Sequence, residues 1–287
     1  MRLAMVAASL LACSLAAQDF SNLSVEKIAA NYKFTEGPAW SKEGFLLFSD
    51  VPTDRILKAT SEGVTPFRVK SNGANGNAYD DKGRLYTCES RTRRVVRTDR
   101  KGVVETLADT FEGKRFNAPN DIVVSKSGNV YFTDPAFGSQ ADTRELAHYG
   151  VYRISAKGDI SLIAKPEGRP NGIALSPDGK ILYVANSDER NVRAYDVGRD
   201  GAVSGERTFV SAIEGVPDGM RTDPKGNLYV AAKHLFVFTP DGKQLAAIQI
   251  PETPTNCSFG EADGGTLFVT AQTSVYRIRL HQTGAAN

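Results

Sequence analysis

The chain has 287 residues, which is enough for one large all-β domain or two small ones. Its 35 Lys and Arg residues nearly balance its 33 Asp and Glu residues, and hydrophobic residues make up 41% of the chain. This scattered, near-neutral charge argues against nucleic acid as a partner, and the composition is ordinary for a globular protein.

The first 17 residues have the features of an export signal. Arg2 supplies a positive charge, residues 3–12 are mainly apolar, and residues 14–17 offer small side chains for cleavage. The apolar run is too short to span a bilayer as a permanent helix. We therefore predict a signal peptide at 1–17, a single domain at 18–287, no membrane span, and a periplasmic or secreted location. The alternative is a lipoprotein anchored through Cys13.

Six segments after this signal share one pattern, in which a polar residue is followed eight positions later by a glycine and then by a β-rich run. The pairs are Glu36/Gly44, Asn75/Gly83, Asn120/Gly128, Asn171/Gly179, Asp218/Gly226 and Asn256/Gly264. Successive glycines lie 39, 45, 51, 47 and 38 residues apart. Repeats of this length are typical of radial or stacked arrays, in which one repeat position recurs around an axis.

Each repeat contains up to four strand-like segments separated by turn residues. In the third repeat these segments are residues 120–124, 130–133, 150–155 and 160–164. The sixth repeat lacks a fourth segment, whereas an additional strand at 24–29 precedes the first repeat. We therefore predict an all-β, six-bladed β-propeller with four strands per blade, whose last blade is closed by the N-terminal strand. A barrel or a sandwich, the alternative folds, would not explain four strands in every period.

The repeated polar position predicts a cation site. The first strand of each propeller blade lines the central channel, so these six residues should gather at one channel end. All six carry a side-chain oxygen and none is His or Cys, which suits Ca²⁺ better than Zn²⁺, although Mg²⁺, Mn²⁺ and Zn²⁺ remain alternatives. The predicted ligands of the divalent cation are Glu36, Asn120, Asn171 and Asp218. Asn75 and Asn256 are predicted to hold water or substrate. The alternative is that the pairs at 75–76, 171–172 and 218–219 are ordinary turn signals.

A second set of polar residues follows the second strand of four repeats: Asp50, Glu89, Asp134 and Asn186. That strand runs back antiparallel to the first, so we predict that these residues bind substrate or orient the cation ligands. Ordinary loop polarity is the alternative. The longest connection, residues 135–149, leaves the same face and is predicted to act as a lid or binding loop. Cys88 and Cys257 are predicted to be buried thiols, with a disulfide as the alternative.

Several motifs resemble those of the gluconolactonase family, which includes the senescence marker protein regucalcin. They lie at residues 34–40, 117–121, 131–135, 170–174 and 217–219, and the resemblance covers nearly all of the chain after the signal. It implies a six-bladed propeller with a divalent cation in the channel, held by Glu36, Asn171 and Asp218. In much of the family, an Asn at the position of Asn120 binds the metal, or binds its water and substrate.

Two positions differ from the family pattern. Ser90 stands where many relatives have His, and Ala118 stands where regucalcin-like members have Arg. Recognition of a sugar lactone in the regucalcin manner would therefore need other groups here. Arg221, Arg91 and the 135–149 connection are the candidates, and Arg221 is predicted to bind substrate together with Asn75, Asn120 and Asp134.

The activity predicted from these residues is metal-dependent hydrolysis of a small-molecule lactone of the gluconolactonase type. The cation would polarise the lactone carbonyl, and an activated water would attack it. Asp218 is the predicted general base, with direct attack by its carboxylate as the alternative. Two other functions fit the same pattern: a phosphotriesterase or arylesterase, and a non-enzymatic, calcium-stabilised propeller that binds a sugar or a protein. The identity of the lactone and the oligomeric state are not predicted.

Overall fold

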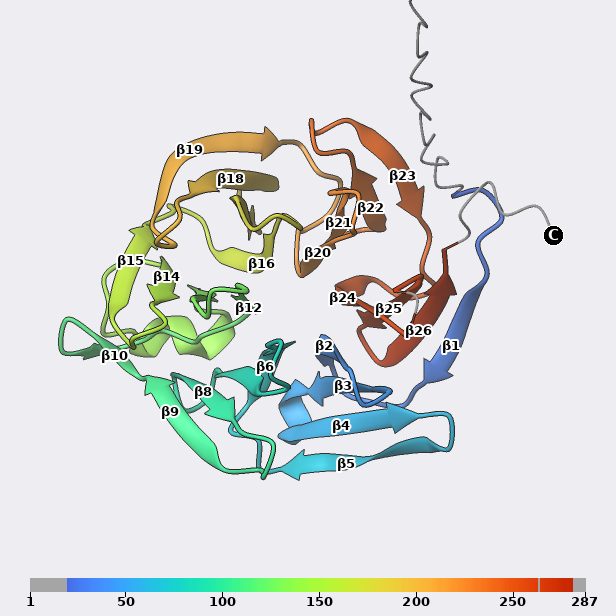
Figure 1. Ribbon diagram of the computed structural model, residues 1–287, viewed down its shortest axis with the longest axis horizontal. Coiled ribbons are helices and arrows are strands. Elements are labelled where there is room, and N and C mark those ends of the chain that lie inside the picture. The colour runs from blue at the N-terminus through green and yellow to red at the C-terminus, as the bar shows by residue number, and fades with distance from the viewer. Residues whose placement is uncertain (1–19, 263, 281–287) are drawn as a thin grey trace, which may run out of the picture.

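The computed structural model describes residues 20–262 and 264–280, and the predicted signal peptide lies outside them. Six four-stranded antiparallel sheets stand around a central channel (Figure 1). The six-bladed propeller predicted from the sequence is therefore confirmed. Nowhere in the described ranges is there a helix with the length and apolar character that crossing a bilayer requires.

Within each blade the strands follow one another outward from the channel. The first strands are β2 (Thr35–Ser41), β6 (Ala74–Tyr79), β12 (Ile122–Val124), β16 (Pro170–Leu175), β20 (Met220–Thr222) and β24 (Pro254–Gly260). The second strands are β3 (Phe45–Asp50), β7 (Leu85–Glu89), β13 (Val130–Asp134), β17 (Ile181–Asn186), β21 (Leu228–Ala231) and β25 (Thr266–Ala271).

The outer half of each blade is more exposed. The third strands are β4 (Arg55–Thr60), β8 (Arg94–Thr98), β14 (Gly150–Ile154), β18 (Asn191–Val197), β22 (Leu235–Phe238) and β26 (Ser274–Arg279). The fourth strands are β5 (Gly63–Val69), β9 (Val104–Ala108), β15 (Ile160–Ala164), β19 (Val203–Val210), β23 (Gln244–Ile248) and β1 (Val25–Ala29). The connections carry a small hairpin, β10 (Thr110–Phe111) and β11 (Lys114–Arg115), and two 3₁₀ helices, η1 (Val51–Thr53) and η2 (Gly138–Thr143).

The hydrophobic core lies between neighbouring blades. Every residue of β3, β7, β13, β21 and β25 is buried, because both faces of a second strand are covered by adjacent blades. This explains why these segments read as continuous apolar runs rather than as alternating patterns. Between the third and fourth blades, for example, Tyr131 packs with Ile173 and Leu182. A buried ring of this size contributes roughly 2–3 kcal/mol.

The six repeat glycines are turn residues, as the sequence predicts. Each has a positive φ, between 62° and 87°, and each donates its N–H to the carbonyl three residues earlier. Residues other than glycine adopt this left-handed conformation at a cost, so glycine recurs at this point of the hairpin between the first and second strands. The turn fixes where the first strand ends, and with it the register of the channel-lining residues.

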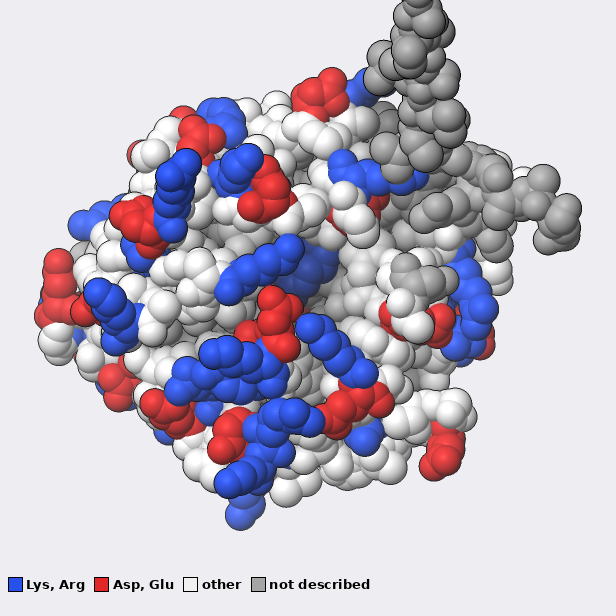
Figure 2. Space-filling model, in the orientation of Figure 1, with Lys and Arg blue, Asp and Glu red and all other residues white. Residues whose placement is uncertain are grey.

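The ring is closed by the N-terminal strand. β1 pairs antiparallel with β26, which gives the last sheet the order β1-β26-β25-β24 (Figure 1). On the face drawn in Figure 2, Lys and Arg side chains are interspersed with Asp and Glu rather than gathered by sign. Cys88 and Cys257 are buried free thiols in different blades.

Glu252 stabilises the region in which the propeller ring closes. Its Oε2 accepts hydrogen bonds from the N–H and the hydroxyl of Thr273, both at 2.8 Å, and its Oε1 accepts from Ser274 and from the Tyr276 hydroxyl at 2.9 Å. Lys27 of β1 lies 3.4 Å from Oε1. Burial alone would raise the pKa of Glu252, but the hydrogen bonds from Ser274 and Thr273 outweigh it and lower the pKa to about 2.

Replacing Glu252 by Gln should therefore weaken the closure. We expect the free energy of unfolding at neutral pH to fall by about 1.5–3 kcal/mol, the usual contribution of a hydrogen bond to a charged group. Because the folded pKa lies below the ordinary 4.5 of Glu, this contribution is present above about pH 4.5 and is lost as the pH falls toward about 2. Urea unfolding of both proteins at several pH values measures it.

Glu214→Gln is the control for this change, because Glu214 pairs only with Lys233 on the exposed surface. That variant should leave stability nearly unchanged. A Glu252→Gln protein as stable as the unmodified chain at neutral pH would show that Glu252 does not fasten the ring.

Candidate functional site

One end of the channel opens into a cavity of about 340 Å³ that gathers the repeated polar residues. Its lining consists of Phe34, Glu36, Val51, Asn75, Ser90, Ala118, Asn120, Phe137, Gln140, Asn171 and Asp218. All four predicted cation ligands are therefore brought together, and Asn75 joins them. Two lining residues, Phe137 and Gln140, come from the long connection at 135–149, which was predicted to border the site.

The polar residues approach closely because glycines follow them. Gly37 has a φ of +51°, and a Cβ added there would lie 2.0 Å from the carbonyl oxygen of Asn75 in the next blade. A Cβ on Gly172 would likewise lie 2.2 Å from the carbonyl oxygen of Asp218. The Asn-Gly pairs of β6 and β16 thus lie in strands rather than in turns. The alternative explanation of these pairs as turn signals is wrong, because their glycines let adjacent blades meet at the channel.

Glu36 is a buried carboxylate in β2. Its Oε2 accepts the Gly37 N–H at 2.7 Å and the Asn256 amide at 3.2 Å. Burial raises the pKa of Glu36 to about 7, and the neighbouring Asp121 carboxylate adds to the effect, whereas the two hydrogen bonds oppose it. The Arg221 cation favours the ionised form of Glu36, but its effect is weaker than those of burial and of Asp121.

Asp218 is the second carboxylate of the cavity and is partly exposed to it. Burial, then repulsion from Glu36 and Asp121, raises its pKa well above the ordinary value of Asp. Hydrogen bonds from the Asn171 side chain and the Gly219 N–H act in the opposite direction. Two carboxylates that raise each other's pKa in one cavity are typical of functional sites.

The asparagines of the cavity differ in how much of their hydrogen-bonding capacity is used. Asn171 donates to the hydroxyl of Ser187 at 3.1 Å. The side-chain oxygen of Asn75 is buried and has no hydrogen-bond partner among the described residues. A buried carbonyl oxygen without a partner costs free energy unless a ligand satisfies it. Asn75 is thus a candidate for direct contact with a cation or a substrate.

Asp121 is a site residue that the sequence prediction missed. It is buried, its Oδ1 accepts the Ile122 N–H at 2.9 Å, and its Oδ2 accepts the Ile173 N–H at 3.2 Å. It therefore ties the blade that carries Asn120 to the blade that carries Asn171. Its place directly after Asn120, ahead of an apolar run, was the only available signal.

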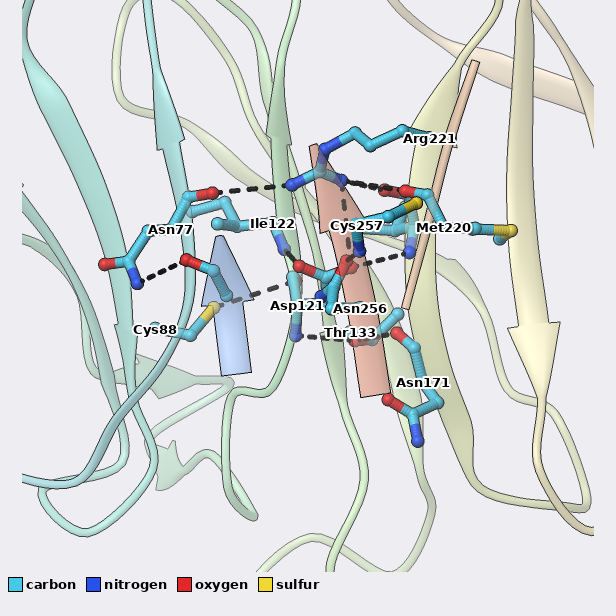
Figure 3. A network of polar contacts seen from close by, with 12 residues as sticks. Asn77, Cys88, Asp121, Ile122, Thr133, Asn171, Met220, Arg221, Asn256 and Cys257 are labelled. Carbon is cyan, nitrogen blue, oxygen red and sulfur yellow. Dashed lines mark hydrogen bonds and ion pairs between the residues drawn. The ribbon is translucent and has the colours of Figure 1, made fainter. Parts of the chain in front are cut away.

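Arg221 lies along the channel beside Asp121 and does not line the cavity, although it was predicted to bind substrate (Figure 3). Its guanidinium donates to the carbonyls of Met220, Ile173 and Asn77 at 3.0, 3.2 and 3.4 Å. It also lies 3.9 Å from Asp121 Oδ2. The side chain is therefore occupied in joining blades.

The charges of this region suit one divalent cation. Glu36, Asp218 and Asp121 bring three carboxylates together, and Arg221 supplies one positive charge against them. Full ionisation would leave two negative charges, beside the unpaired oxygen of Asn75. Within the described chain no three His, Cys, Asp or Glu side chains form a metal cluster, so the donor set depends on amide oxygens. Such a set fits Ca²⁺ and does not resemble a zinc site.

Asp134 and Asn256 are held away from the cavity. Both oxygens of Asp134 accept backbone N–H groups, from Asn117 and Ala118 at 2.8 Å each, so its carboxylate shapes the strand entry instead of contacting substrate. Asn256 stands behind Glu36, with its amide on that carboxylate and its oxygen on the Cys257 N–H.

The other members of the second polar set also have structural partners. Asp50 accepts hydrogen bonds from Lys33 N and Arg55, and Glu89 pairs with Arg68 and Arg94. Asn186 accepts the N–H groups of the following turn. None of these three residues lines the cavity, and neither does Asp134. All four are buried at the ends of second strands, so ordinary loop polarity does not describe them either.

The sequence and the fold of this chain are similar to those of known proteins. A family model described as "SMP-30/Gluconolactonase/LRE-like region" matches residues 34–273. A gluconolactonase of Zymomonas mobilis subsp. mobilis is 38% identical, over 91% of this chain and 82% of the relative. A pentonolactonase of Haloferax volcanii is 28% identical, over 82% of this chain and 80% of the relative. The solved structure of a gluconolactonase from Xanthomonas campestris is similar with a TM-score of 0.84 and 33% identity, over 91% of this chain and 90% of that one.

Proposed function

Because this chain belongs to the SMP-30/gluconolactonase/LRE-like family, we propose that it is a lactonase that hydrolyses a small-molecule lactone in the channel cavity. The observation that carries the proposal is the convergence of Glu36, Asn171 and Asp218 on one cavity that is open to solvent. The similarity to relatives named gluconolactonase and pentonolactonase supports a lactone as the substrate class.

We propose that the cavity holds one divalent cation, with Ca²⁺ favoured by the oxygen donor set. Glu36, Asn120, Asn171 and Asp218 would hold it, and the unpaired oxygen of Asn75 is a further donor. When bound, such a cation polarises a carbonyl and stabilises the negative charge that develops on its oxygen. The uncompensated charge of Glu36 and Asp218 is the physical reason to expect it.

Asp218 is the proposed general base. Both carboxylates line the cavity, but Glu36 is the more buried of the two and its Oε2 is engaged by Gly37 and Asn256. Asp218 is partly exposed, so a water can approach its carboxylate, and its raised pKa suits proton transfer near neutral pH. Asp218 would take the proton from water as the water attacks the lactone carbonyl. Asn120, whose side chain makes no hydrogen bond with the described residues, is placed to orient the substrate.

The test is hydrolysis of a lactone panel by residues 18–287, after chelation and again with Ca²⁺, Mg²⁺, Mn²⁺ or Zn²⁺ restored. We expect activity to disappear with chelator and to return best with Ca²⁺. Undiminished activity in chelator would contradict the cation while leaving the lactonase intact. If no lactone is hydrolysed although calorimetry shows a bound cation, the lactonase proposal is wrong, and aryl esters and phosphotriesters are the next substrates.

We also propose that the chain is exported. The proposal rests on the charged, apolar and small residues at 1–17. Mass spectrometry of the protein from its native compartment should find an N-terminus close to residue 18. Lipid attached to Cys13 would point instead to the lipoprotein alternative.

A further inference from the structure

The cavity has two chemically different parts. Five lining residues carry side-chain oxygens on or next to the first strands, namely Glu36, Asn75, Asn120, Asn171 and Asp218. Four apolar lining residues come from the connections between strands, namely Phe34, Val51, Ala118 and Phe137, which we call the apolar wall; Ser90 and Gln140 also line the cavity from connections. The first part accounts for the proposed cation and the reacting carbonyl. The apolar wall has no role in that chemistry.

Phe34 is held in an exposed position by its backbone. The residue is 38% exposed, although most large apolar side chains of this fold are buried. Its N–H donates to Asp50 Oδ1 at 3.2 Å, and its carbonyl accepts the Val51 N–H at 3.0 Å. The strand entry therefore keeps an aromatic ring at the cavity, two residues before Glu36. An exposed ring beside a cavity is a surface suited to an apolar ligand.

Phe137 faces the cavity from the start of η2. The guanidinium of Arg169 lies 4.7 Å from the centroid of its ring. Arg169 Nε is in turn held by both oxygens of Asp188, at 3.0 and 3.1 Å. Because Asp188 pairs with Arg169, the guanidinium is held over the Phe137 ring and its charge is compensated. Phe137 therefore presents an apolar surface of fixed orientation to the cavity.

The polar groups that a polyhydroxylated ring needs are scarce at the apolar wall. No Lys, Arg or His lines the cavity in the described part of the chain. The Ser90 hydroxyl already donates to the Pro119 carbonyl at 2.7 Å, and position 118 is an Ala. Apart from the Gln140 amide, the apolar wall offers sugar hydroxyls only carbon, whereas an alkyl or aryl group would be removed from water there.

We propose that the substrate is a lactone carrying an apolar alkyl or aryl substituent, which packs on Phe34 and Phe137 while its carbonyl faces Asp218 and Asn120. This inference rests on the proposed lactonase function and narrows its substrate class. It assigns Phe34 and Phe137 as residues that determine specificity.

The test compares kcat/KM of the full chain, with Ca²⁺ present, for γ-butyrolactone, γ-nonalactone, γ-phenyl-γ-butyrolactone and glucono-δ-lactone. We expect the alkyl and phenyl lactones to exceed both others by about tenfold or more, the usual effect of filling an apolar pocket. This comparison uses the unmodified protein, so it does not depend on whether a variant folds.

Variants identify the residues responsible. Phe34→Ser and Phe137→Ser should each reduce the ratio of kcat/KM between phenyl-substituted and unsubstituted lactone by about tenfold, mainly through KM. Phe67→Ser is the matched control, because Phe67 is 42% exposed on β5 and does not line the cavity. That variant should keep the ratio of the unmodified chain.

The outcomes separate the two proposals. Glucono-δ-lactone or γ-butyrolactone as the best substrate would overturn the apolar-substituent inference and leave the lactonase standing. An unchanged ratio in both Phe variants would overturn the assignment of the apolar wall. Failure to hydrolyse any of the four lactones with Ca²⁺ bound would overturn the lactonase proposal itself.

Discussion

Replacing Asp218 by Asn should lower kcat/KM for lactone hydrolysis by about 10³-fold, within the range that loss of a general base produces. The amide has nearly the shape of the carboxylate but cannot accept a proton from water. It also removes one of the two negative charges of the cavity, the other being that of Glu36. Steady-state kinetics on the preferred lactone, over a series of cation concentrations that ends in large excess, measures the loss.

Asp223→Asn is the matched control for this change. Asp223 is also a mostly buried carboxylate of the fifth blade, and it caps the turn after β20 by accepting the N–H groups of Lys225 and Asn227 at 2.9 Å. It lies outside the cavity, so kcat/KM should stay within about twofold of the unmodified chain. Full activity in Asp218→Asn would exclude Asp218 as the base. A lost activity that excess cation restores would show that Asp218 acts as a ligand alone.

The fold could be predicted because its determinants are local and repeated. Each turn glycine predicts a hairpin between the first and second strands of its blade. The additional strand at 24–29 predicts how the ring closes, because the sixth repeat is one strand short. The gathering of the repeated polar residues in one cavity could be predicted for the same reason, because one repeat position becomes one place in space. Glu36, Asn171 and Asp218 needed only the propeller geometry to be brought together.

The remaining parts of the site depend on contacts between segments that are distant in sequence. Asn75 and Asn256 share a repeat position, yet Asn75 lines the cavity and has a buried side-chain oxygen without a partner among the described residues, whereas Asn256 supports Glu36. Asp134 was predicted to bind substrate, but both of its carboxylate oxygens accept hydrogen bonds from the N–H groups of residues 117–118. The apolar wall escaped prediction because Phe137 reaches the cavity through a long loop whose path no periodicity encodes.

The metal-free protein should become less stable as the pH rises from about 5 to about 8. Glu36 has a folded pKa of about 7 against an ordinary 4.5, so over this range the folded state holds a proton that the unfolded state has lost. The raised pKa of Asp218 acts in the same direction. We expect Glu36 by itself to lower the free energy of unfolding by about 2–3 kcal/mol between these limits, from the size of its pKa shift. Urea unfolding in chelator measures it.

A bound cation should abolish the part of this pH dependence that comes from Glu36 and Asp218, because it pairs with their ionised forms and stabilises the folded state as the pH rises. Asp134, whose pKa burial also raises to about 7, titrates in the same range but lies outside the cavity, so its part of the pH dependence should persist. Glu36→Gln separates the contribution of Glu36 from that of Asp134. In chelator, the free energy of unfolding of this variant should depend less on pH than that of the unmodified chain, and added Ca²⁺ should stabilise the variant less. Two results would contradict this account: a metal-free free energy of unfolding that is constant or rises toward pH 8, or a Glu36→Gln protein whose stability depends on pH as strongly as that of the unmodified chain. Either would mean that the cavity carboxylates do not oppose folding. Charge compensation would then be no reason for this propeller to bind a cation.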